Sequence, residues 1–344
     1  MTDYYVSPVG FSDAETVSKV KKLLEKEGIE LDRNLDYIAA IFDSDSNVIA
    51  TGSAFRNMLR CFAVDSAHRG EGLLNLIVTH LAEVQADRGN SHLFIYSKAI
   101  YSSFFEKLGF HEIARVDDSF VFMENCKDGF SSYIDALART RFEEGISGAV
   151  VMNANPFTKG HQYLLEKACS ECDHLHLFIV SEDLSIIPYS VRYSLVKEAI
   201  KNLDKIIIHD TGSYIISSAT FPSYFLKDEI SVAQAQARLD AIVFTKIAKA
   251  LNITVRFVGN EPLSAVTSIY NDVLRSQLPK EGISFRIIPR LKVNGVPISA
   301  SNVRKAIKED DWATVKALLP SSSYDFFRSS DAAPIIRRIK ESQQ

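Results

Sequence analysis

The sequence ISGAVVMNANPFTKGHQYLLEKACSE, residues 146–171, decides the fold of the second half of the chain. Its apolar start, up to Met152, is typical of a buried parallel strand. A short turn, 153–157, follows, and Thr158 then opens an amphipathic helix with leucines at helical spacing. A helix amino terminus presents free N–H groups and a partial positive charge, which favour a polyphosphate. The stretch therefore predicts a strand, a turn and a phosphate-binding helix start.

Three residues at the start of this helix have the chemistry for phosphate contact. Thr158 and His161 are three apart, so they share one helical face, and both can donate to phosphate oxygens. Gly160 allows a ligand to approach the backbone closely. The alternative is that His161 only caps or packs against the helix start.

Two segments of the chain resemble signatures of the nucleotidyltransferase superfamily. T-K-G-H (158–161) resembles its (H/T)-x-G-H signature, which holds the triphosphate while the α-phosphate is attacked. I-S-A-S-N-V-R (298–304) resembles its I-S-S-T-x-x-R signature, whose amino terminus and arginine grip the β- and γ-phosphates. Taken alone, Ser299 and Ser301 would be helix caps. Two signatures in the expected chain order are far more specific than either one.

Composition and charge exclude several classes of protein. The chain has 344 residues, 46% hydrophobic and 24% charged, an ordinary globular composition that favours two domains. A net charge of −4 does not suit an extended nucleic-acid surface. No apolar run approaches the roughly 20 residues of a membrane span, and the start lacks a signal-peptide pattern. We expect a cytoplasmic protein with no nucleic-acid and no membrane partner.

Four cysteines are too few for a disulfide framework in a chain of this length. Cys169 and Cys172 form a C-x-x-C, with His174 and His176 close behind. These four side chains would have to converge to bind zinc. Packing of the two cysteines in the core is the preferred interpretation.

The first 128 residues predict a mixed α+β domain. We expect a helix at 13–27 and three strands at 35–41, 48–55 and 58–64. Residues 67–74 then lead into a helix that runs to about 87, followed by a strand at 93–96, a helix at 101–108 and a strand at 120–124. This order, with R-G-E-G (69–72) and F-F-E-K-L-G-F (104–110), resembles the GNAT acyltransferase family. In that family, backbone N–H groups at a helix start grip the pyrophosphate of coenzyme A.

The GNAT resemblance implies that Arg69, Gly70, Glu71 and Gly72 form the loop that binds the pantetheine arm of coenzyme A, here called the arm-binding loop. Two residues depart from the family pattern. Leu74 stands where the family has a small residue, and Phe105 stands where it often has a tyrosine that acts as general acid. A phenyl ring cannot donate a proton. We therefore interpret this domain as a binder of a CoA-like pantetheine arm. A domain that only packs is the alternative.

Residues 129–145 predict a linker helix, and residues 146–344 a second domain. From 146 on, strands and helices alternate, which is typical of a Rossmann-like parallel sheet. G-N-E (259–261) follows a predicted strand, at the carboxyl edge where such sheets bind ligands. The polar and aromatic loop 214–225 is a candidate substrate-gripping segment.

A GNAT-like domain followed by a T-x-G-H domain resembles the [citrate (pro-3S)-lyase] ligase family over nearly the whole chain. The further matching segments are N-A-N-P-F-T-K-G-H (153–161), S-E-D (181–183) with Pro188 and Arg192, Y-I-I-S-S-A-T-F-P-S-Y-F (214–225), V-G-N-E-P (258–262), Tyr270-Asn271 and I-P-R (288–290). Ile187 departs from the pattern, because a phenylalanine is expected before the proline.

The family resemblance implies a reaction and its site residues. Acetate reacts with ATP to give acetyl-adenylate and pyrophosphate. The acetyl group then passes to the thiol of a CoA-derived prosthetic group on the acyl-carrier subunit of citrate lyase, and AMP leaves. The implied catalytic residues are Thr158, Lys159, His161 and Arg304, which would stabilise the leaving pyrophosphate. The implied ATP contacts are Asn153, Asn155, Pro156, Phe157, Gly160, Gly259, Asn260, Glu261, Ile298, Ser299 and Ser301, with Mg²⁺ bound through ATP rather than by protein ligands.

Two other activities stay open at this point. A nucleotidyltransferase that moves AMP or CMP onto a phosphate-bearing acceptor would share both phosphate signatures, and it would need no acetate and no thiol. A GNAT acetyltransferase would need acetyl-CoA and no ATP, but Phe105 and the intact phosphate signatures count against it. The chain has no G-x-x-x-x-G-K-[ST] and no G-x-G-x-x-G, so it is neither a P-loop enzyme nor a typical dinucleotide binder.

Overall fold

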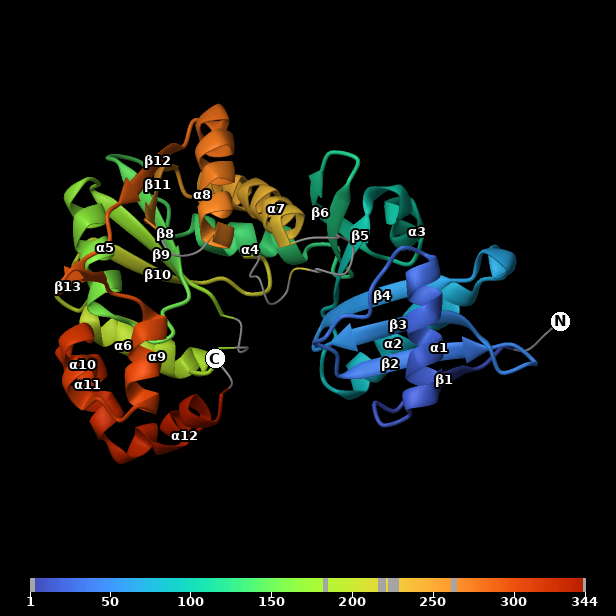
Figure 1. The fold of residues 1–344 in the computed structure, drawn as a ribbon. Helices are drawn as coiled ribbons and strands as arrows, with labels where there is room; N and C mark the ends of the chain where they lie inside the picture. Colours follow the sequence, from blue (N-terminus) through green and yellow to red (C-terminus); the bar gives the residue numbers. More distant parts are fainter. Residues whose placement is uncertain (1–3, 182–184, 216–220, 222–228, 261–264, 343–344) are drawn as a thin grey trace. The chain divides into compact units, whose positions relative to one another are not determined.

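The computed structural model describes residues 4–181, 185–215, 221, 229–260 and 265–342 (Figure 1). The chain divides into two compact units. The first comprises residues 1–132 and 218–242, and the second comprises residues 133–217 and 243–344. Each unit contains its own sheet, and each is described by itself below.

The first unit is built on a seven-stranded mixed sheet. Its strands are β1 (Val6–Pro8), β2 (Tyr37–Phe42), β3 (Val48–Phe55), β4 (Met58–Val64), β5 (Phe94–Lys98), β6 (His111–Val116) and β7 (Phe120–Glu124), in the order β1-β2-β3-β4-β5-β7-β6. Its principal helices are α1 (Ala14–Lys26), α2 (Leu73–Asp87) and α3 (Ser102–Lys107). The helices and strands expected for residues 1–128 are present, and the structure adds two strands that were not expected, β1 before α1 and β6 between α3 and β7.

Strands β4 and β5 form a parallel pair, whereas the other pairs in this sheet are antiparallel. Their register joins Met58 to Phe94 and Leu59 to Ile95, at the start of both strands. Beyond these residues the register of the pair ends, so the carboxyl halves of β4 and β5 have room between them. This gap positions a cavity that is described below.

Helices cover both faces of the first sheet. Val20 and Leu24 of α1 pack in one core cluster, and Ile77 and Leu81 of α2 pack in another with residues of α3. Gly52 in β3 allows α2 to approach, because a Cβ at Gly52 would lie 2.4 Å from Cγ2 of Ile77. The sheet is therefore buried on both sides.

The second unit is built on a five-stranded parallel sheet. Its strands are β8 (Ser147–Met152), β9 (His174–Ile179), β10 (Ile206–Asp210), β11 (Ile253–Gly259) and β12 (Ser284–Ile288), in the order β10-β9-β8-β11-β12. The helices that flank or follow it are α5 (Lys159–Ser170), α6 (Tyr189–Ala199), α8 (Ala265–Gln277), α9 (Ala300–Lys308), α10 (Trp312–Leu318), α11 (Ser321–Arg328) and α12 (Ala333–Glu341). A short hairpin, β13 (Lys292–Val293) and β14 (Val296–Pro297), precedes α9.

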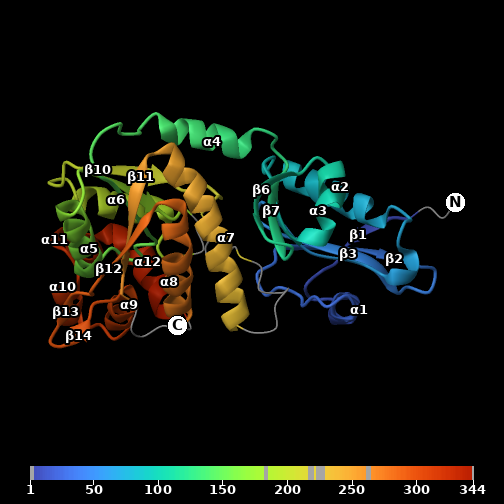
Figure 2. The ribbon, with the colours of Figure 1, turned by 90° about the horizontal axis from the view of Figure 1, so that it is seen from above.

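The strand order places β8 in the centre of the second sheet. The chain moves from β8 outward to β9 and β10, and it then returns to the other side of β8 with β11. Ligands of doubly wound sheets bind where the strand order reverses, outside the carboxyl ends of the strands. Figure 2 shows α5 and α6 on one side of this sheet and α8 on the other. The expected Rossmann-like fold is confirmed.

The division between the units falls within two helices along the chain. It lies after residue 132 in α4 (Gly129–Ala138) and after residue 242 in α7 (Glu229–Ala250). Residues 218–242 belong to the first unit although they follow β10. Within that unit, Phe221 packs edge-on against Tyr96, with 5.7 Å between ring centroids, and Arg238 pairs with Asp117. The expected domain of residues 146–344 therefore contains a segment that packs with the first unit.

Two local predictions can be compared with the structure. Cys169 and Cys172 are buried in the core between the sheet and α5, so their packing role is confirmed. The sequence pattern of residues 190–202 predicts a helix capped by Ser190, and this cap is wrong, because α6 begins at Tyr189 and Pro188 is its N-cap residue. Proline suits a helix start, since its missing N–H and fixed φ cost nothing there.

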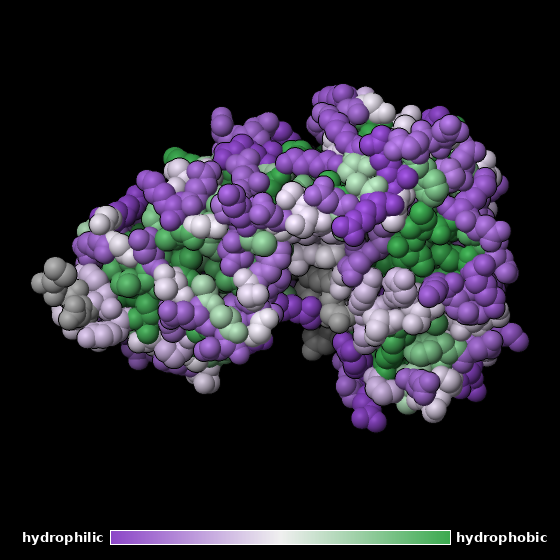
Figure 3. Space-filling model, turned by 180° about the vertical axis from the view of Figure 1, so that it is seen from behind, coloured by the Kyte–Doolittle hydropathy of each residue, from purple (hydrophilic) through white to green (hydrophobic). Residues whose placement is uncertain are grey.

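Surface polarity is mixed. Hydrophilic residues cover most of the face drawn in Figure 3, and hydrophobic residues gather there in separate patches. Within the described residues, no helix combines the length and the apolar composition needed to cross a membrane.

A buried histidine pair joins β9 to β10. Nδ1 of His176 lies 2.8 Å from Nε2 of His209, and both side chains are buried. Burial lowers the pKa of each imidazole to about 4, and the positive charge that a neighbouring histidine would carry adds to this effect. The native pair is therefore neutral at pH 7.

This pair should make stability depend on pH between about 6.5 and 4. The unfolded histidines bind protons below their ordinary pKa of about 6.5, whereas the native pair does not, so the free energy of unfolding falls as the pH falls. Denaturant unfolding at pH 7.0 and 5.0 should show this loss, and a His209→Gln variant should lose less stability between the two pH values than the parent. An equal loss in both proteins would contradict the assignment.

Candidate active site

A cavity of about 640 Å³ opens in the second unit at the carboxyl ends of β8, β11 and β12. Four groups of residues line it: the strand ends with the residues that follow them, the start of α5, part of α8, and the segment that enters α9. The lining residues used below are Asn153, Thr158, Gly160, His161, Arg256, Gly259, Tyr270, Asn271, Arg290, Ile298, Ser299, Ser301 and Asn302. This is the crevice that the reversal of strand order predicts.

Thr158 and His161 form a reciprocal cap at the start of α5. The Thr158 hydroxyl accepts from the His161 backbone N–H at 3.3 Å, and the Thr158 backbone N–H donates to Nδ1 of His161 at 3.0 Å. Because Nδ1 accepts a hydrogen bond, the proton of the neutral ring resides on Nε2. Thr158 is only 1% exposed, so its main observed role is to orient His161.

The environment of His161 keeps the imidazole neutral. Burial is the main cause that lowers its pKa to about 4, and the nearby Arg290 guanidinium lowers it further. Phe157 is fully buried and stacks on the ring, with 5.6 Å between the ring centroids. The result is an oriented, uncharged N–H donor at a cavity wall.

A second helix start lies beside the first. Ser299 is the N-cap residue of α9 and accepts from the Asn302 backbone N–H at 3.1 Å. A Cβ placed on Gly160 would lie 3.4 Å from the Ile298 carbonyl oxygen, so the starts of α5 and α9 are neighbours. Both line the cavity, and each helix start favours an anion.

Two arginines supply positive charge near these helix starts. Arg290 lines the cavity and donates to the Ile298 carbonyl at 3.3 Å. Arg304 donates to the Asn155 carbonyl at 2.7 Å and to the Ser301 hydroxyl at 3.3 Å. Burial lowers the pKa of both guanidinium groups, which nevertheless stay charged at neutral pH. Arg304 does not itself line the cavity, but it holds Ser301, which does.

Lys159 lies apart from the other predicted catalytic residues. Its ammonium donates to the carbonyl oxygens of Lys316 and Ala317, at 3.1 and 2.8 Å, at the carboxyl end of α10. The carboxyl end of a helix carries a partial negative charge that favours a cation. In this arrangement Lys159 ties the start of α5 to α10 and does not face the cavity.

The structure brings many of the predicted ATP contacts together. The predicted contacts that line the cavity are Asn153, Gly160, Gly259, Ile298, Ser299 and Ser301. The predicted contacts that do not line it are Asn155, Pro156, Phe157 and Asn260. Glu261 lies outside the described residues.

Several lining residues were not predicted as site residues, and among them are the polar residues Arg256, Tyr270, Asn271 and Arg290. Three of these four stand in segments that matched the family pattern, Tyr270-Asn271 and I-P-R (288–290). Arg290 lies two residues after the end of β12. This position at the carboxyl edge of a parallel sheet could have predicted it as a site residue.

The donors around this cavity suit a polyphosphate. They include two helix starts, the Nε2 of a neutral histidine and the guanidinium group of Arg290. No carboxylate is among the described residues that line the cavity. Across the described part of the chain, there is no cluster of three or more His, Cys, Asp or Glu side chains placed to hold a metal ion.

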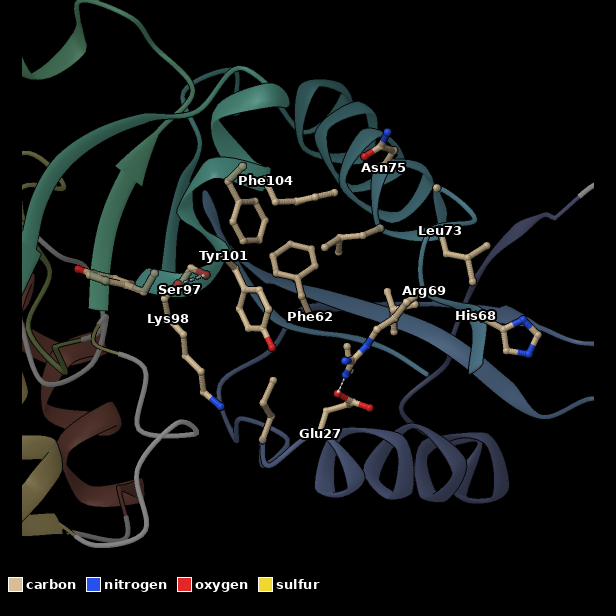
Figure 4. Close-up of a pocket in the computed structure, with 18 residues that line it drawn as sticks. Glu27, Phe62, His68, Arg69, Leu73, Asn75, Ser97, Lys98, Tyr101 and Phe104 are labelled. Atoms are coloured by element: carbon tan, nitrogen blue, oxygen red, sulfur yellow. Dashed lines mark hydrogen bonds and ion pairs between the residues drawn. The ribbon is translucent and has the colours of Figure 1, made fainter. Parts of the chain in front are cut away.

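A second cavity, of about 460 Å³, lies within the first unit (Figure 4). It occupies the gap between the carboxyl halves of β4 and β5 and extends to the start of α2. Its walls are largely aromatic, from Phe62, Tyr96, Tyr101, Phe104 and Phe105. Three residues of the predicted arm-binding loop, Arg69, Gly70 and Gly72, line it.

The charged residues of this loop have partners in the first unit. Arg69 donates to the Glu27 carboxylate at 2.5 Å, as Figure 4 shows at the rim of the cavity. Glu71 does not line the cavity and instead accepts from the Tyr4 hydroxyl at 2.5 Å. The Tyr4 hydrogen bond, followed by the contact with His68, holds the pKa of Glu71 below its usual value. Glu71 therefore braces the loop.

Comparison with known proteins decides the family. The model of the citrate lyase ligase C-terminal domain matches residues 147–327. A [citrate [pro-3S]-lyase] ligase of Klebsiella pneumoniae is 37% identical over 312 residues, which cover 89% of this chain and 91% of that protein. The protein of the same name from Escherichia coli (strain K12) is 34% identical over 324 residues, 92% of each chain.

The chain belongs to the [citrate [pro-3S]-lyase] ligase family. The ligase of Haemophilus influenzae, at 33% identity, spans 92% of this chain and 96% of its own length. The family predicted from the sequence is thus confirmed, and with it the assignment of the chain as an enzyme.

Part of this chain resembles solved structures of acyltransferases. An acyl-CoA N-acyltransferase of Pseudomonas aeruginosa covers 36% of this chain and all of its own, with 13% identity and a TM-score of 0.30. Glucosamine-6-phosphate N-acetyltransferase of Arabidopsis thaliana covers 33% of this chain and 96% of its own, with 18% identity and a TM-score of 0.28.

The state of His161 can be measured directly. In the ligand-free protein, histidine-selective ¹⁵N NMR should show a neutral ring down to about pH 5 with the proton on Nε2, because Nδ1 accepts from Thr158. Arg290→Gln should raise this pKa partway, since it removes a positive charge. Lys159→Gln is the matched control, because the Lys159 ammonium contacts the carboxyl end of α10 and not His161. A proton on Nδ1 or a charged ring at pH 7 would contradict the geometry.

Proposed function

We propose that this chain joins acetate to the thiol of a CoA-derived prosthetic group on the acyl-carrier subunit of citrate lyase, in two steps that consume ATP. In the first step an acetate oxygen attacks the α-phosphorus, the bond to the β-phosphate oxygen breaks, and acetyl-adenylate and pyrophosphate form. In the second step the thiolate attacks the acetyl carbon, the bond to the phosphate oxygen of AMP breaks, and the thioester forms. The thiol proton passes to solvent or a base.

The convergence of two helix starts on one cavity carries this proposal. The starts of α5 and α9 both line the cavity at the carboxyl edge of the sheet, beside Nε2 of His161 and the Arg290 guanidinium. These groups are donors or cations, which match a triphosphate and the pyrophosphate that leaves. The names of the relatives support the choice of the carrier as the acyl acceptor.

Each residue contributes mainly by position and charge. His161 donates from Nε2 to a phosphate oxygen without needing to change its charge, and Thr158 holds the ring in that tautomer. Arg290 offsets negative charge that builds on the leaving group, and Arg304 holds Ser301 at the start of α9. Mg²⁺ would arrive bound to ATP and screen the charge of the phosphates.

The cavity of the first unit is proposed to hold the pantetheine arm. The carboxyl halves of β4 and β5 extend past their shared register and offer backbone groups to an extended amide chain. Gly70 and Gly72, both at positive φ, shape the loop that enters α2 and would face the phosphates of the arm. Phe105 is 3% exposed and offers no proton, so a binding role is favoured over acetyl transfer.

ATP–pyrophosphate exchange tests the adenylation step. With millimolar Mg²⁺, exchange should depend on added acetate. His161→Ala should lower the rate by about 10²- to 10³-fold, the usual loss for one preorganised donor. Lys159→Ala, the neighbouring control, should lower it far less, because its ammonium lies on α10.

The carrier thiol, the proposed acetyl acceptor, is the next reagent to test if exchange is not seen. If exchange is absent, deacetylated citrate lyase with its free thiol is added and pyrophosphate release is measured again. No release under either condition would overturn the ligase proposal and leave a phosphate-bearing nucleotidyl acceptor as the alternative. His161→Ala with normal turnover would overturn the assigned site.

Binding of coenzyme A tests the arm cavity. Calorimetry with the whole chain should detect coenzyme A, and Arg69→Gln should weaken binding roughly tenfold, because a charged group facing phosphate is lost. Pantetheine lacks the phosphates, so its affinity should be the same in both proteins. Equal affinities of the two proteins for coenzyme A would show that Arg69 does not contact the phosphates.

A further inference from the structure

Arg192 carries a fully buried charged side chain close to the candidate active site. It lies in the first turn of α6 and is 0% exposed. A buried charge is costly unless its donors are paired, so a guanidinium group in this place requires acceptors fixed by the fold. The identity of those acceptors indicates what Arg192 does.

The guanidinium group of Arg192 donates to carbonyl oxygens from three segments. Nε donates to Ile187 at 3.0 Å, and Nη1 donates to Asn153 at 2.8 Å and to Val180 at 2.7 Å. Asn153 follows the end of β8, Val180 follows the end of β9, and Ile187 precedes α6. One side chain thus joins two neighbouring strand ends and a helix start at the carboxyl edge of the sheet.

Other hydrogen bonds fix the same turn between β8 and α5. The Ile187 backbone N–H donates to Oδ1 of Asn155 at 3.2 Å, and the Ser185 hydroxyl donates to Oδ1 of Asn153 at 3.1 Å. From the other side, Arg304 donates to the Asn155 carbonyl. The turn leads directly to Thr158, whose backbone N–H holds Nδ1 of His161.

We propose that Arg192 is a positioning residue for adenylation, acting through the turn 153–157 on the placement of His161. The inference rests on the proposed function. It requires a planar side chain with several N–H donors, because acceptors in three segments must be held at once, and a lysine ammonium on a flexible stem does not fix such a set. Small misplacements of a reacting group can cost about 10²-fold in rate.

A double-mutant cycle tests this role in ATP–pyrophosphate exchange. Arg192→Lys should lower kcat about 10- to 100-fold while the KM for ATP changes less than about threefold, because placement is lost and the binding groups remain. In a His161→Ala background the same substitution should cost less than about threefold, since the residue through which it acts is gone. Additive losses in the two backgrounds would overturn the proposal.

Arg60→Lys is the matched control. Arg60 is also a buried arginine, 1% exposed, but it pairs with Asp32 in the first unit. Its replacement should lower the unfolding midpoint and leave kcat per folded molecule unchanged. Arg192→Gln, which retains two N–H donors, serves as the second variant. If both Arg192 variants lack folded protein, the residue is needed for folding and the positioning role is overturned.

The two proposals fail in different ways. Absence of exchange by the parent, with and without the carrier, rejects the proposed function. Exchange by the parent together with a normal kcat in Arg192→Lys rejects only the positioning role.

Discussion

Hydrogen bonds from two guanidinium groups to backbone carbonyls hold the turn between β8 and α5. Arg192 binds the carbonyl of Asn153, and Arg304 binds that of Asn155. Carbonyl groups at the end of a central strand need partners, because burial without a hydrogen bond costs roughly 1–3 kcal/mol each. The chain satisfies them with side chains from α6 and α9, and these contacts also fix where α5 begins. The remaining features of the site depend on that fixed point.

Hydrogen bonding and electrostatics act together on one imidazole, that of His161. The backbone N–H of Thr158 selects the tautomer of His161, while burial and Arg290 select its charge state. Neither effect alone would give an oriented donor, because a charged ring would present two N–H groups and a freely rotating ring would present either nitrogen. The helix cap therefore has a chemical role in addition to its contribution to helix stability.

Local patterns predicted most of the fold, and long-range contacts limited what could be predicted of the site. The strand, turn and helix of residues 146–171 follow from hydrophobic spacing, and the two signatures correctly indicated helix starts at Thr158 and Ser299. Lys159 shows the limit, because only the folded chain brings the carboxyl end of α10 to its ammonium. The helical pattern of α6 likewise gave no sign that Arg192 contacts the carbonyl oxygens that follow β8 and β9, as well as that of Ile187 just before its own helix.

Residues 218–242 follow β10 in the sequence but are grouped with the first unit, where Phe221 lies against Tyr96, a wall of the aromatic cavity. No single cut along the chain separates the two units. A fragment that begins before β8 would carry Phe221, which is 4% exposed in the whole chain, without its aromatic neighbour. A fragment that ends there would leave Tyr96 uncovered. The folded units therefore do not coincide with two consecutive stretches of sequence, and a chimaera that exchanged one half of the chain would have to exchange this segment together with the first unit.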